Sequence, residues 1–412
     1  MQDDSGKGRS PFYPGQPVPV EFFAGRRDQI ERIVRAAGQV RNGKPQALFL
    51  VGEYGIGKSS LAAYARRLLE KDLALLGIHV FLGGAKDVAD VATKTVEAAI
   101  KARVYQPTVS EKIRNFLAKY VGQPEVFGVS IDFERLRADG PGLSRGFLPF
   151  LRELLAHVRE DGPTGILLIL DETNGISTNP EFAHFIKTVV DENATGDDPV
   201  PLLLMLCGTE ERRRDLIGHH PPVERIFDVV DIAPMTEPEM VGFYTKAFES
   251  VGMAVLPDAM KRLCHYAAGF PRVMHTIGDE VFWADRDSVV DLPDATAGVI
   301  GAAREIGRKF VDAQVYQALM SKDYRSILDK LGRAQFDIAF KKADIEQGLT
   351  PTEQGKFDNF LQRMKRLQVL RAGDTKGEYV FCSRIVRLYI VLNSLPPSSP
   401  EDEPPVVSDR AN

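Results

Sequence analysis

One stretch of eight residues limits the folds open to this chain more than any other feature. Residues 52–59, Gly-Glu-Tyr-Gly-Ile-Gly-Lys-Ser, match the pattern GxxxxGK[ST] in full. The apolar run QALFLV (46–51) precedes them and predicts a buried strand. The stretch KSSLAAYARRLLEK (58–71) has apolar residues at helical spacing and predicts a helix. A strand, a glycine-rich turn and a helix in this order are typical of a phosphate-binding loop.

Each residue type in this stretch has a physical role toward phosphate. Glycines let the backbone fold tightly with its N–H groups pointing inward, and the following helix adds free amides and its positive dipole end. Lys58 supplies charge to the β- and γ-phosphates, and the Ser59 hydroxyl completes a Mg²⁺ shell. We therefore expect ATP and Mg²⁺ as cofactors. The predicted nucleotide-binding residues here are Gly52, Glu53, Tyr54, Gly55, Ile56, Gly57, Lys58, Ser59 and Ser60.

A bound Mg²⁺ needs further hard oxygen ligands, and a second strand offers them. The run GILLIL (165–170) is followed at once by Asp171 and Glu172. Asp171 at the end of the strand is predicted to hold Mg²⁺ through water. Glu172 points elsewhere and is predicted to orient and polarise the attacking water, which favours hydrolysis over passive binding.

Three more residues are candidates for sensing or completing the phosphate site. Thr209 follows the strand PLLLMLC (201–207), where its hydroxyl could reach the γ-phosphate or the lytic water. A simple turn, or the use of Cys207 or Glu210 instead, is an alternative. Arg225 precedes the last core strand and is a candidate arginine for a neighbouring subunit's site. Arg272, in GFPR, could report the γ-phosphate and couple two domains. For both arginines, an ordinary surface role is the alternative.

The remaining pattern predicts an α/β fold with a parallel-sheet P-loop core. Apolar runs without alternation, separated by helices, indicate a parallel sheet covered on both faces. After Pro234 the pattern becomes helical, and near residue 320 it changes again to helices, a β-hairpin and a last helix. The predicted domains are a disordered N-terminus (1–17), the ATPase core (18–235), a helical lid (236–316), a winged helix (317–393) and a disordered, acidic, proline-rich tail (394–412).

The predicted winged helix is basic in an acidic protein. Residues 320–392 hold 14 Lys/Arg and 9 Asp/Glu, a local charge of +5 against −5 for the whole chain. Basic and polar residues share one side of the expected helix 352–367, a face suited to DNA phosphates and base edges. The candidate DNA-binding residues are Lys356, Asn359, Arg363, Arg366 and, at the hairpin tip, Lys376. Protein binding, or a face that is merely solvated, is the alternative, and Asp358 and Asp374 favour it mildly.

Composition indicates a cytoplasmic protein. The three cysteines are far apart and give no zinc pattern or disulfide framework, which suits a reducing compartment. The first residues lack the apolar core of a signal peptide, and no apolar run approaches the ~20 residues needed to span a bilayer. We therefore expect no membrane partner.

Taken together, these motifs resemble the AAA+ superfamily of P-loop ATPases. FFAGRRDQIERI (22–33) is similar to the box that precedes Walker A there, GEYGIGKSS to Walker A itself, and LILDET to Walker B. GFPR is similar to the sensor 2 motif of the initiator, or origin-recognition-like, clade and of the related STAND and archaeal-type ATPases. The resemblance implies that adenine lies near Phe23, Gly25 and Arg26. Thr209 stands where the clade often has Asn, and residues 86–150 carry no recognisable motif.

Two functions follow from this resemblance. In the first, the chain is an ATP-hydrolysing switch that forms a homo-oligomer, completes each site with a neighbour's Arg225 and engages duplex DNA or a DNA–protein complex. In the second, it is a STAND-like signalling or scaffold ATPase in which ATP sets conformation and the winged helix binds protein. A metabolic P-loop kinase is a weaker third reading, because no acceptor-substrate motif accompanies the loop.

Overall fold

The computed structural model describes residues 7–15, 25–104, 141–158, 162–317, 319 and 321–394. The chain forms two compact units. The core unit comprises residues 16–239 together with 270–272, and the C-terminal unit comprises the remaining residues. Apart from residues 236–239 and 270–272, the predicted lid falls within the same compact unit as the predicted winged helix, and the boundary between the two stays a prediction.

The core unit is built on a five-stranded parallel sheet, which confirms the predicted fold class. Its strands lie in the order β2-β3-β4-β1-β5. Their bounds are β1 (Gln46–Val51), β2 (Leu75–Phe81), β3 (Gly165–Asp171), β4 (Leu202–Gly208) and β5 (Asp228–Asp231). The four longer strands, β1 to β4, are almost entirely buried, since helices cover both faces of the sheet.

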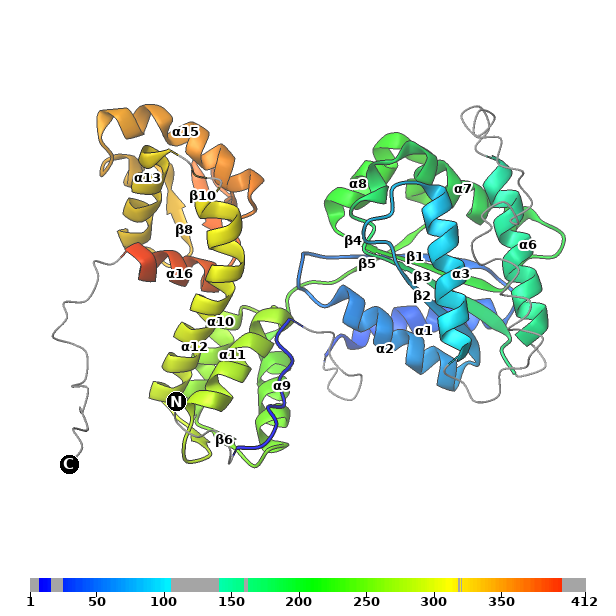
Figure 1. Cartoon of the computed structure of the whole chain (residues 1–412), viewed down its shortest axis with the longest axis horizontal. Coiled ribbons are helices and arrows are strands. Elements are labelled where there is room, and N and C mark those ends of the chain that lie inside the picture. Colours follow the sequence, from blue (N-terminus) through cyan, green and yellow to red (C-terminus); the bar gives the residue numbers. More distant parts are fainter. Residues whose placement is uncertain are drawn as a thin grey trace, which may run out of the picture. The chain divides into compact units, whose positions relative to one another are not determined.

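Alternate residues of each strand enter two separate apolar clusters. On one face, Phe49 and its neighbours pack with α3 (Val88–Val104), α6 (Pro141–Val158), α7 (Pro180–Thr195) and α8 (Glu210–His219). On the other face, Leu48 and Leu50 pack with α1 (Arg27–Arg41) and α2 (Lys58–Asp72). Figure 1 shows α1 and α2 on one side of the strands and α7 and α8 on the other. Burial on both faces accounts for the continuous apolar runs in the sequence.

Strand order decides which loops meet at the carboxyl edge of the sheet. β4 lies between β1 and β3, with Val51 opposite Gly208 and Leu170 opposite Leu206. β2 flanks β3 on its other side, with Phe81 opposite Asp171. The ends of β1, β3 and β4 therefore bring the glycine loop, the acidic pair and Thr209 to one edge.

The C-terminal unit begins with a group of helices. These are α9 (Glu237–Glu249), α10 (Pro257–Ala267), α11 (Pro271–Ala284) and α12 (Leu292–Ile306), which continues as the π-helical η6 (Gly307–Tyr316). Two short strands, β6 (Ala254–Val255) and β7 (Val289–Val290), pair in parallel. Thr236 and Glu239 make the capping bonds that their spacing predicts, because the Glu239 carboxylate accepts from the Thr236 N–H at 2.8 Å.

The N-terminal residues 7–15 pack on this helical group, contrary to the predicted disorder of residues 1–17. Phe12 is 4% exposed and lies edge-on to Phe248, with ring centroids 4.9 Å apart. The Tyr13 N–H donates to His275 Nδ1 at 3.2 Å, and burial lowers the pKa of His275 to about 4, so the ring stays neutral and can accept. The prediction failed because composition alone does not show that one aromatic side chain has a pocket.

The last part of the C-terminal unit contains the predicted helices and hairpin. In order these are α13 (Lys322–Arg333), β8 (Ala339–Lys341), α14 (Lys342–Glu346), α15 (Pro351–Arg366), β9 (Leu370–Ala372), β10 (Glu378–Phe381) and α16 (Arg384–Ser394). The three strands form an antiparallel sheet in the order β8-β10-β9. Gly307 lies against Tyr389, since a Cβ atom there would come within 2.1 Å of the ring, so η6 and α16 pack closely.

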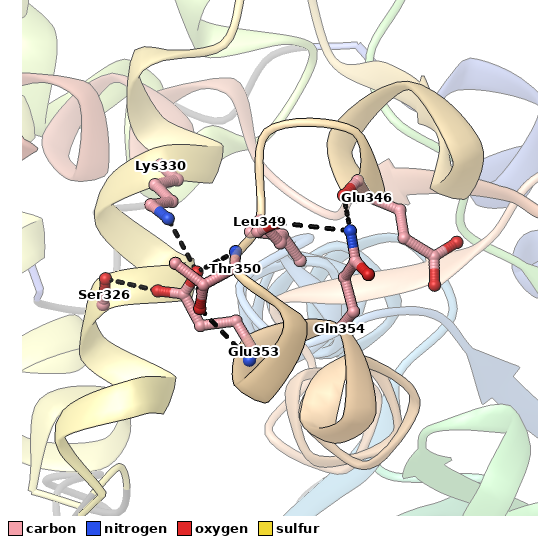
Figure 2. A network of polar contacts seen from close by, with 7 residues as sticks. All are labelled: Ser326, Lys330, Glu346, Leu349, Thr350, Glu353 and Gln354. Atoms are coloured by element: carbon pink, nitrogen blue, oxygen red, sulfur yellow. Dashed lines mark hydrogen bonds and ion pairs between the residues drawn. The ribbon is translucent and has the colours of Figure 1, made fainter.

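Glu353 of α15 makes hydrogen bonds to two residues of α13. Its carboxylate accepts from Ser326 Oγ and from Lys330 Nζ, each at 2.6 Å, and completes the predicted capping box with Thr350 (Figure 2). Gln354 donates to the carbonyls of Glu346 and Leu349 in the preceding turn. The hydrogen bonds that Lys330, Ser326 and Thr350 donate to Glu353 hold its pKa at about 2, below the usual 4.5, and the bond from Lys330 contributes most.

The segment VFGVSIDF (126–133), whose sequence predicts a strand or hairpin arm, and the acidic tail beyond Ser394 lie outside the described residues. Within the described residues, no helix combines the length and apolar character that crossing a membrane requires.

Candidate nucleotide-binding site

The loop between β1 and α2 forms a tight cradle. Gly55 and Gly57 adopt φ angles of +78° and +98°, which side chains other than hydrogen rarely allow. A Cβ atom on Gly52 would lie 2.8 Å from Ile56 and 2.9 Å from the carbonyl oxygen of Ile232. The loop therefore needs glycine for two reasons, backbone conformation and space.

Lys58 folds back across this loop. Its Nζ donates to the carbonyls of Gly52 at 2.9 Å and of Glu53 at 2.8 Å. Burial lowers the pKa of Lys58, while the nearby Cys207, Asp171 and Glu53 oppose that shift. A cation held in this partly desolvated place would be stabilised by an anion, which is the role predicted for Lys58. Ser59 and Ser60 follow in the first turn of α2, where backbone amides lack helical partners.

Asp171 and Glu172 have different surroundings at the end of β3. Asp171 is buried, and its Oδ1 accepts the Glu172 N–H at 2.8 Å. Glu172 is exposed and has a left-handed backbone, with φ of +58°. Its carboxylate lies against Gly83, where a Cβ atom would come within 2.5 Å of Oε2. The two acids point apart, as their different predicted roles require.

His79, which sequence reasoning missed, lies beside Asp171. This residue lies on β2, the strand beside β3, and its Nε2 is 3.1 Å from Asp171 Oδ2. A signal was present, since His79 is the one polar side chain in the run IHVFL. That signal can be used only if β2 is known to pair with β3, and the order of strands in a sheet cannot be read from the sequence of one strand.

Thr209 lies at the predicted place, just beyond β4, and caps α8. Its hydroxyl accepts the Arg212 N–H at 3.4 Å. Thr173, which sequence reasoning missed, donates through its hydroxyl to the carbonyl of Cys207 at 3.1 Å. That bond ties the end of β3 to the end of β4 and so fixes Thr209 relative to the acidic pair. The sensor role of Thr209 stays a prediction.

Arg26 reaches the glycine loop from the start of α1. It is 6% exposed, and its guanidinium donates to the Ile56 carbonyl at 3.1 Å and also to the Ala233 carbonyl. Burial lowers the pKa of Arg26. The side chain therefore braces the loop from behind. Phe23, the other predicted adenine contact, lies outside the described residues.

Arg272 lies against the same loop, within the core unit. Its guanidinium carbon is 5.4 Å from the ring centroid of Tyr54, a side chain that is 72% exposed. A Cβ atom on Gly55 would be 3.3 Å from Arg272 Cδ, so the two segments are close neighbours. The structure thus brings Arg272 to the loop, and its role toward a γ-phosphate stays a prediction.

Arg225 ends the short 3-10 helix η5 (Pro221–Arg225) and is exposed. By contrast, the nearby arginines of α8 are engaged, since Arg212 pairs with Asp215 while Arg213 and Arg214 pair with Glu210. Its position leaves Arg225 accessible to another molecule. Nothing in a single chain tests whether it completes a neighbour's site.

The candidate DNA-binding residues gather on the outer side of α15 and on the hairpin. Asn359, Arg363, Arg366 and Lys376 are exposed. Lys356 is exposed as well but pairs with Asp323 of α13. The opposite side of α15, with Phe357, Phe360, Leu361 and Met364, is buried as the helical spacing predicts.

A family model and several solved structures match this chain. The family model described as the AAA ATPase domain matches residues 23–214, which include the glycine loop, the acidic pair and Thr209. The chain is therefore similar to AAA ATPase domains over these residues. No curated protein sequence matches the chain.

The similarity to solved structures covers more of the chain than the family model does. The Walker-type ATPase paby2304 of Pyrococcus abyssi matches over 90% of this chain and 96% of that chain, with 14% identity and a TM-score of 0.53. The ORC2 protein of Aeropyrum pernix, in ADPNP–ADP complexes, matches over 93% and 95%, with 13% identity and a TM-score of 0.53. At such low identity these likenesses show a common fold.

The residues present fit Mg²⁺ and a nucleotide. Gly55 and Gly57 have the left-handed backbone of a tight glycine loop, and Lys58 folds back over that loop. Ser59 and Asp171 offer hard oxygen donors of the kind Mg²⁺ prefers. Among the described residues no cluster of three or more His, Cys, Asp or Glu side chains could hold a metal ion.

Proposed function

We propose that the chain is an ATP-binding and ATP-hydrolysing AAA+-type molecular switch that oligomerises and engages DNA or a DNA–protein complex. The observation that carries the proposal is that Lys58, which follows β1, lies close enough to Asp171 for their charges to interact, while Asp171 and Glu172 end β3 on the other side of β4. A bound Mg²⁺, held by Ser59 and by Asp171 through water, would neutralise phosphate charge.

The chain's own residues then have separate tasks. The loop amides and Lys58 bind the phosphates, and Arg26 braces the loop through the Ile56 carbonyl. Glu172 orients and polarises the attacking water, and Thr209 and Arg272 sense the γ-phosphate. Arg225 from a neighbouring subunit stabilises the charge of the transition state, which links hydrolysis to assembly.

Nucleotide binding is tested with Lys58→Ala. The change removes the loop's cation, so the dissociation constant for ATP should rise at least about tenfold, as the loss of a charged contact of ~1.4 kcal/mol implies. Lys71→Ala, at the exposed end of the same helix, is the control and should bind ATP normally. Equal ATP affinity in the two variants would refute the assigned role of the loop.

The proposed winged helix, residues 317–393, engages DNA through α15 and the hairpin. The support is the order of its helices and strands and the exposed Arg363, Arg366 and Lys376. A phosphate-contacting helix produces binding that weakens steeply with salt. The alternative is a STAND-like ATPase whose corresponding face binds protein, favoured by the pairing of Lys356 with Asp323, which removes one cation from the face.

These two functions are separated by duplex binding measured across a salt series. Changing Lys356, Arg363 and Arg366 together to Ala should lower affinity and reduce the salt dependence. A matched control changes three other exposed cations of the same unit, Lys261, Arg286 and Lys309. If DNA binding survives the first set, or is absent in the wild type, the protein-binding alternative stands.

A further inference from the structure

The side chain of His79 is placed to act on Asp171. β2 pairs in parallel with β3, and the two side chains meet across that pairing with Nε2 and Oδ2 3.1 Å apart. Both are enclosed, since the side chain of His79 is 6% exposed and that of Asp171 is 2% exposed. Because a carboxylate only accepts hydrogen bonds, the imidazole carries a proton on Nε2.

The Asp171 carboxylate is therefore held from two sides. His79 donates to Oδ2, and the Glu172 N–H donates to Oδ1 at 2.8 Å. The imidazole is itself fixed, because it stacks on Phe81 with ring centroids 4.5 Å apart and planes at 20°. A carboxylate with both oxygens engaged cannot rotate, so its remaining lone pairs keep one direction.

We infer that His79 is a positioning residue that orients Asp171 toward the Mg²⁺–nucleotide complex. The inference rests on the proposed function and adds a residue that neither the motifs nor the family match assigns. An apolar side chain would fill this place in a buried strand without the cost of enclosing an imidazole. Groups that orient metal-binding side chains in this way typically change metal affinity by about 10–100-fold when they are removed.

A purely structural role for the pair predicts something different. In that case His79 would serve to satisfy a buried carboxylate, and its removal would lower stability without changing how Mg²⁺ affects nucleotide binding. The two roles are separated by titrating Mg²⁺ against the binding of a fluorescent ATP analogue to the full chain, beside nucleotide binding in EDTA and thermal unfolding.

Three variants make the test. His79→Phe keeps a ring that can stack on Phe81 but has no donor, and should raise the Mg²⁺ concentration at half-maximal effect by about tenfold or more. His79→Gln, whose amide can donate to Asp171, should recover most of that loss. Phe81→Tyr keeps both the donor and the ring on which the imidazole stacks, and should change the Mg²⁺ midpoint less than twofold. Nucleotide binding in EDTA should be the same in all three.

An unchanged Mg²⁺ midpoint in His79→Phe, with a lower melting temperature, would overturn the inference and leave the proposed function intact. If His79→Phe does not fold, His79→Asn, whose amide is too short to reach Asp171, replaces it and should give the same shift. A wild type whose nucleotide binding ignores Mg²⁺ would instead defeat the proposed function, and the inference with it.

Discussion

At the scale of single residues, the polar groups around the glycine loop have two roles, phosphate binding and support of the loop. Lys58, which is half-buried, is proposed to bind phosphate. Others support the loop from within the core unit, and Arg26 is the clearest example, because its guanidinium binds the carbonyls of Ile56 and Ala233. Support of this kind is measurable as stability, separately from any effect on ATP.

Arg26→Ala should lower the free energy of unfolding of the core unit by about 2–3 kcal/mol, the range expected when hydrogen bonds from a charged donor to buried carbonyls are lost. Urea denaturation measures this. Arg27→Ala, at the next residue, is the control, since its 90% exposed side chain makes one i,i+4 ion pair and should cost about 0.5 kcal/mol or less. Equal losses in the two variants would contradict the bracing role.

Residue-level prediction from the sequence was possible where a motif is local. Gly52 to Ser59 directly follow β1, and Asp171 and Glu172 lie at the end of β3, so their proposed roles could be read from one segment each. His79 and Thr173 could not, since their partners, Asp171 and the Cys207 carbonyl, lie on neighbouring strands. Their roles depend on strand order, which periodicity along one segment does not contain.

At the scale of elements, the Glu353 carboxylate joins α13 and α15, beside the Lys356–Asp323 ion pair and the contact of the Tyr324 and Phe360 rings. Glu353 serves the capping box of α15 and accepts from Ser326 and Lys330 of α13. The capping part was predictable from the spacing of Thr350 and Glu353. The contact with α13 was not, because it joins residues 23 or more positions apart.

Glu353→Gln should lower the free energy of unfolding at pH 7 by about 1.5–3 kcal/mol, as expected for hydrogen bonds to a charged group. The folded pKa of Glu353 is about 2, below the usual 4.5. A depressed carboxylate pKa stabilises above the unfolded value and loses that contribution as pH falls through the folded one. The difference between wild type and variant should therefore shrink between about pH 4.5 and pH 2.

Urea unfolding followed at a series of pH values checks this. Glu346→Gln is the control, because its side chain makes only a 3.9 Å pairing with Lys342 in the same helix. A difference between wild type and Glu353→Gln that stays constant down to pH 2 would show that the carboxylate's charge is not what joins the helices.

At the scale of the whole molecule, the proposal links hydrolysis to assembly through Arg225. Arg225→Ala should lower the turnover number by about 10³-fold while ATP affinity stays the same, since such an arginine acts on the transition state. Turnover of the wild type should rise with protein concentration. Arg214→Ala, an exposed arginine paired with Glu210, is the matched control and should retain activity.

If Arg225→Ala hydrolyses ATP as the wild type does, another residue completes the site or each chain works alone. The number of chains in the assembly follows from mass photometry with and without ATP and duplex DNA.

The central claim is that this chain turns over ATP through Glu172. The most direct measurement is steady-state ATP hydrolysis by the wild type and by Glu172→Gln, with ATP affinity determined in parallel. Because Glu172 is exposed beside a fixed Asp171, the amide should leave binding intact and lower turnover by about 10²–10⁴-fold, the range for loss of a general base. Hydrolysis that survives Glu172→Gln unchanged would contradict the account.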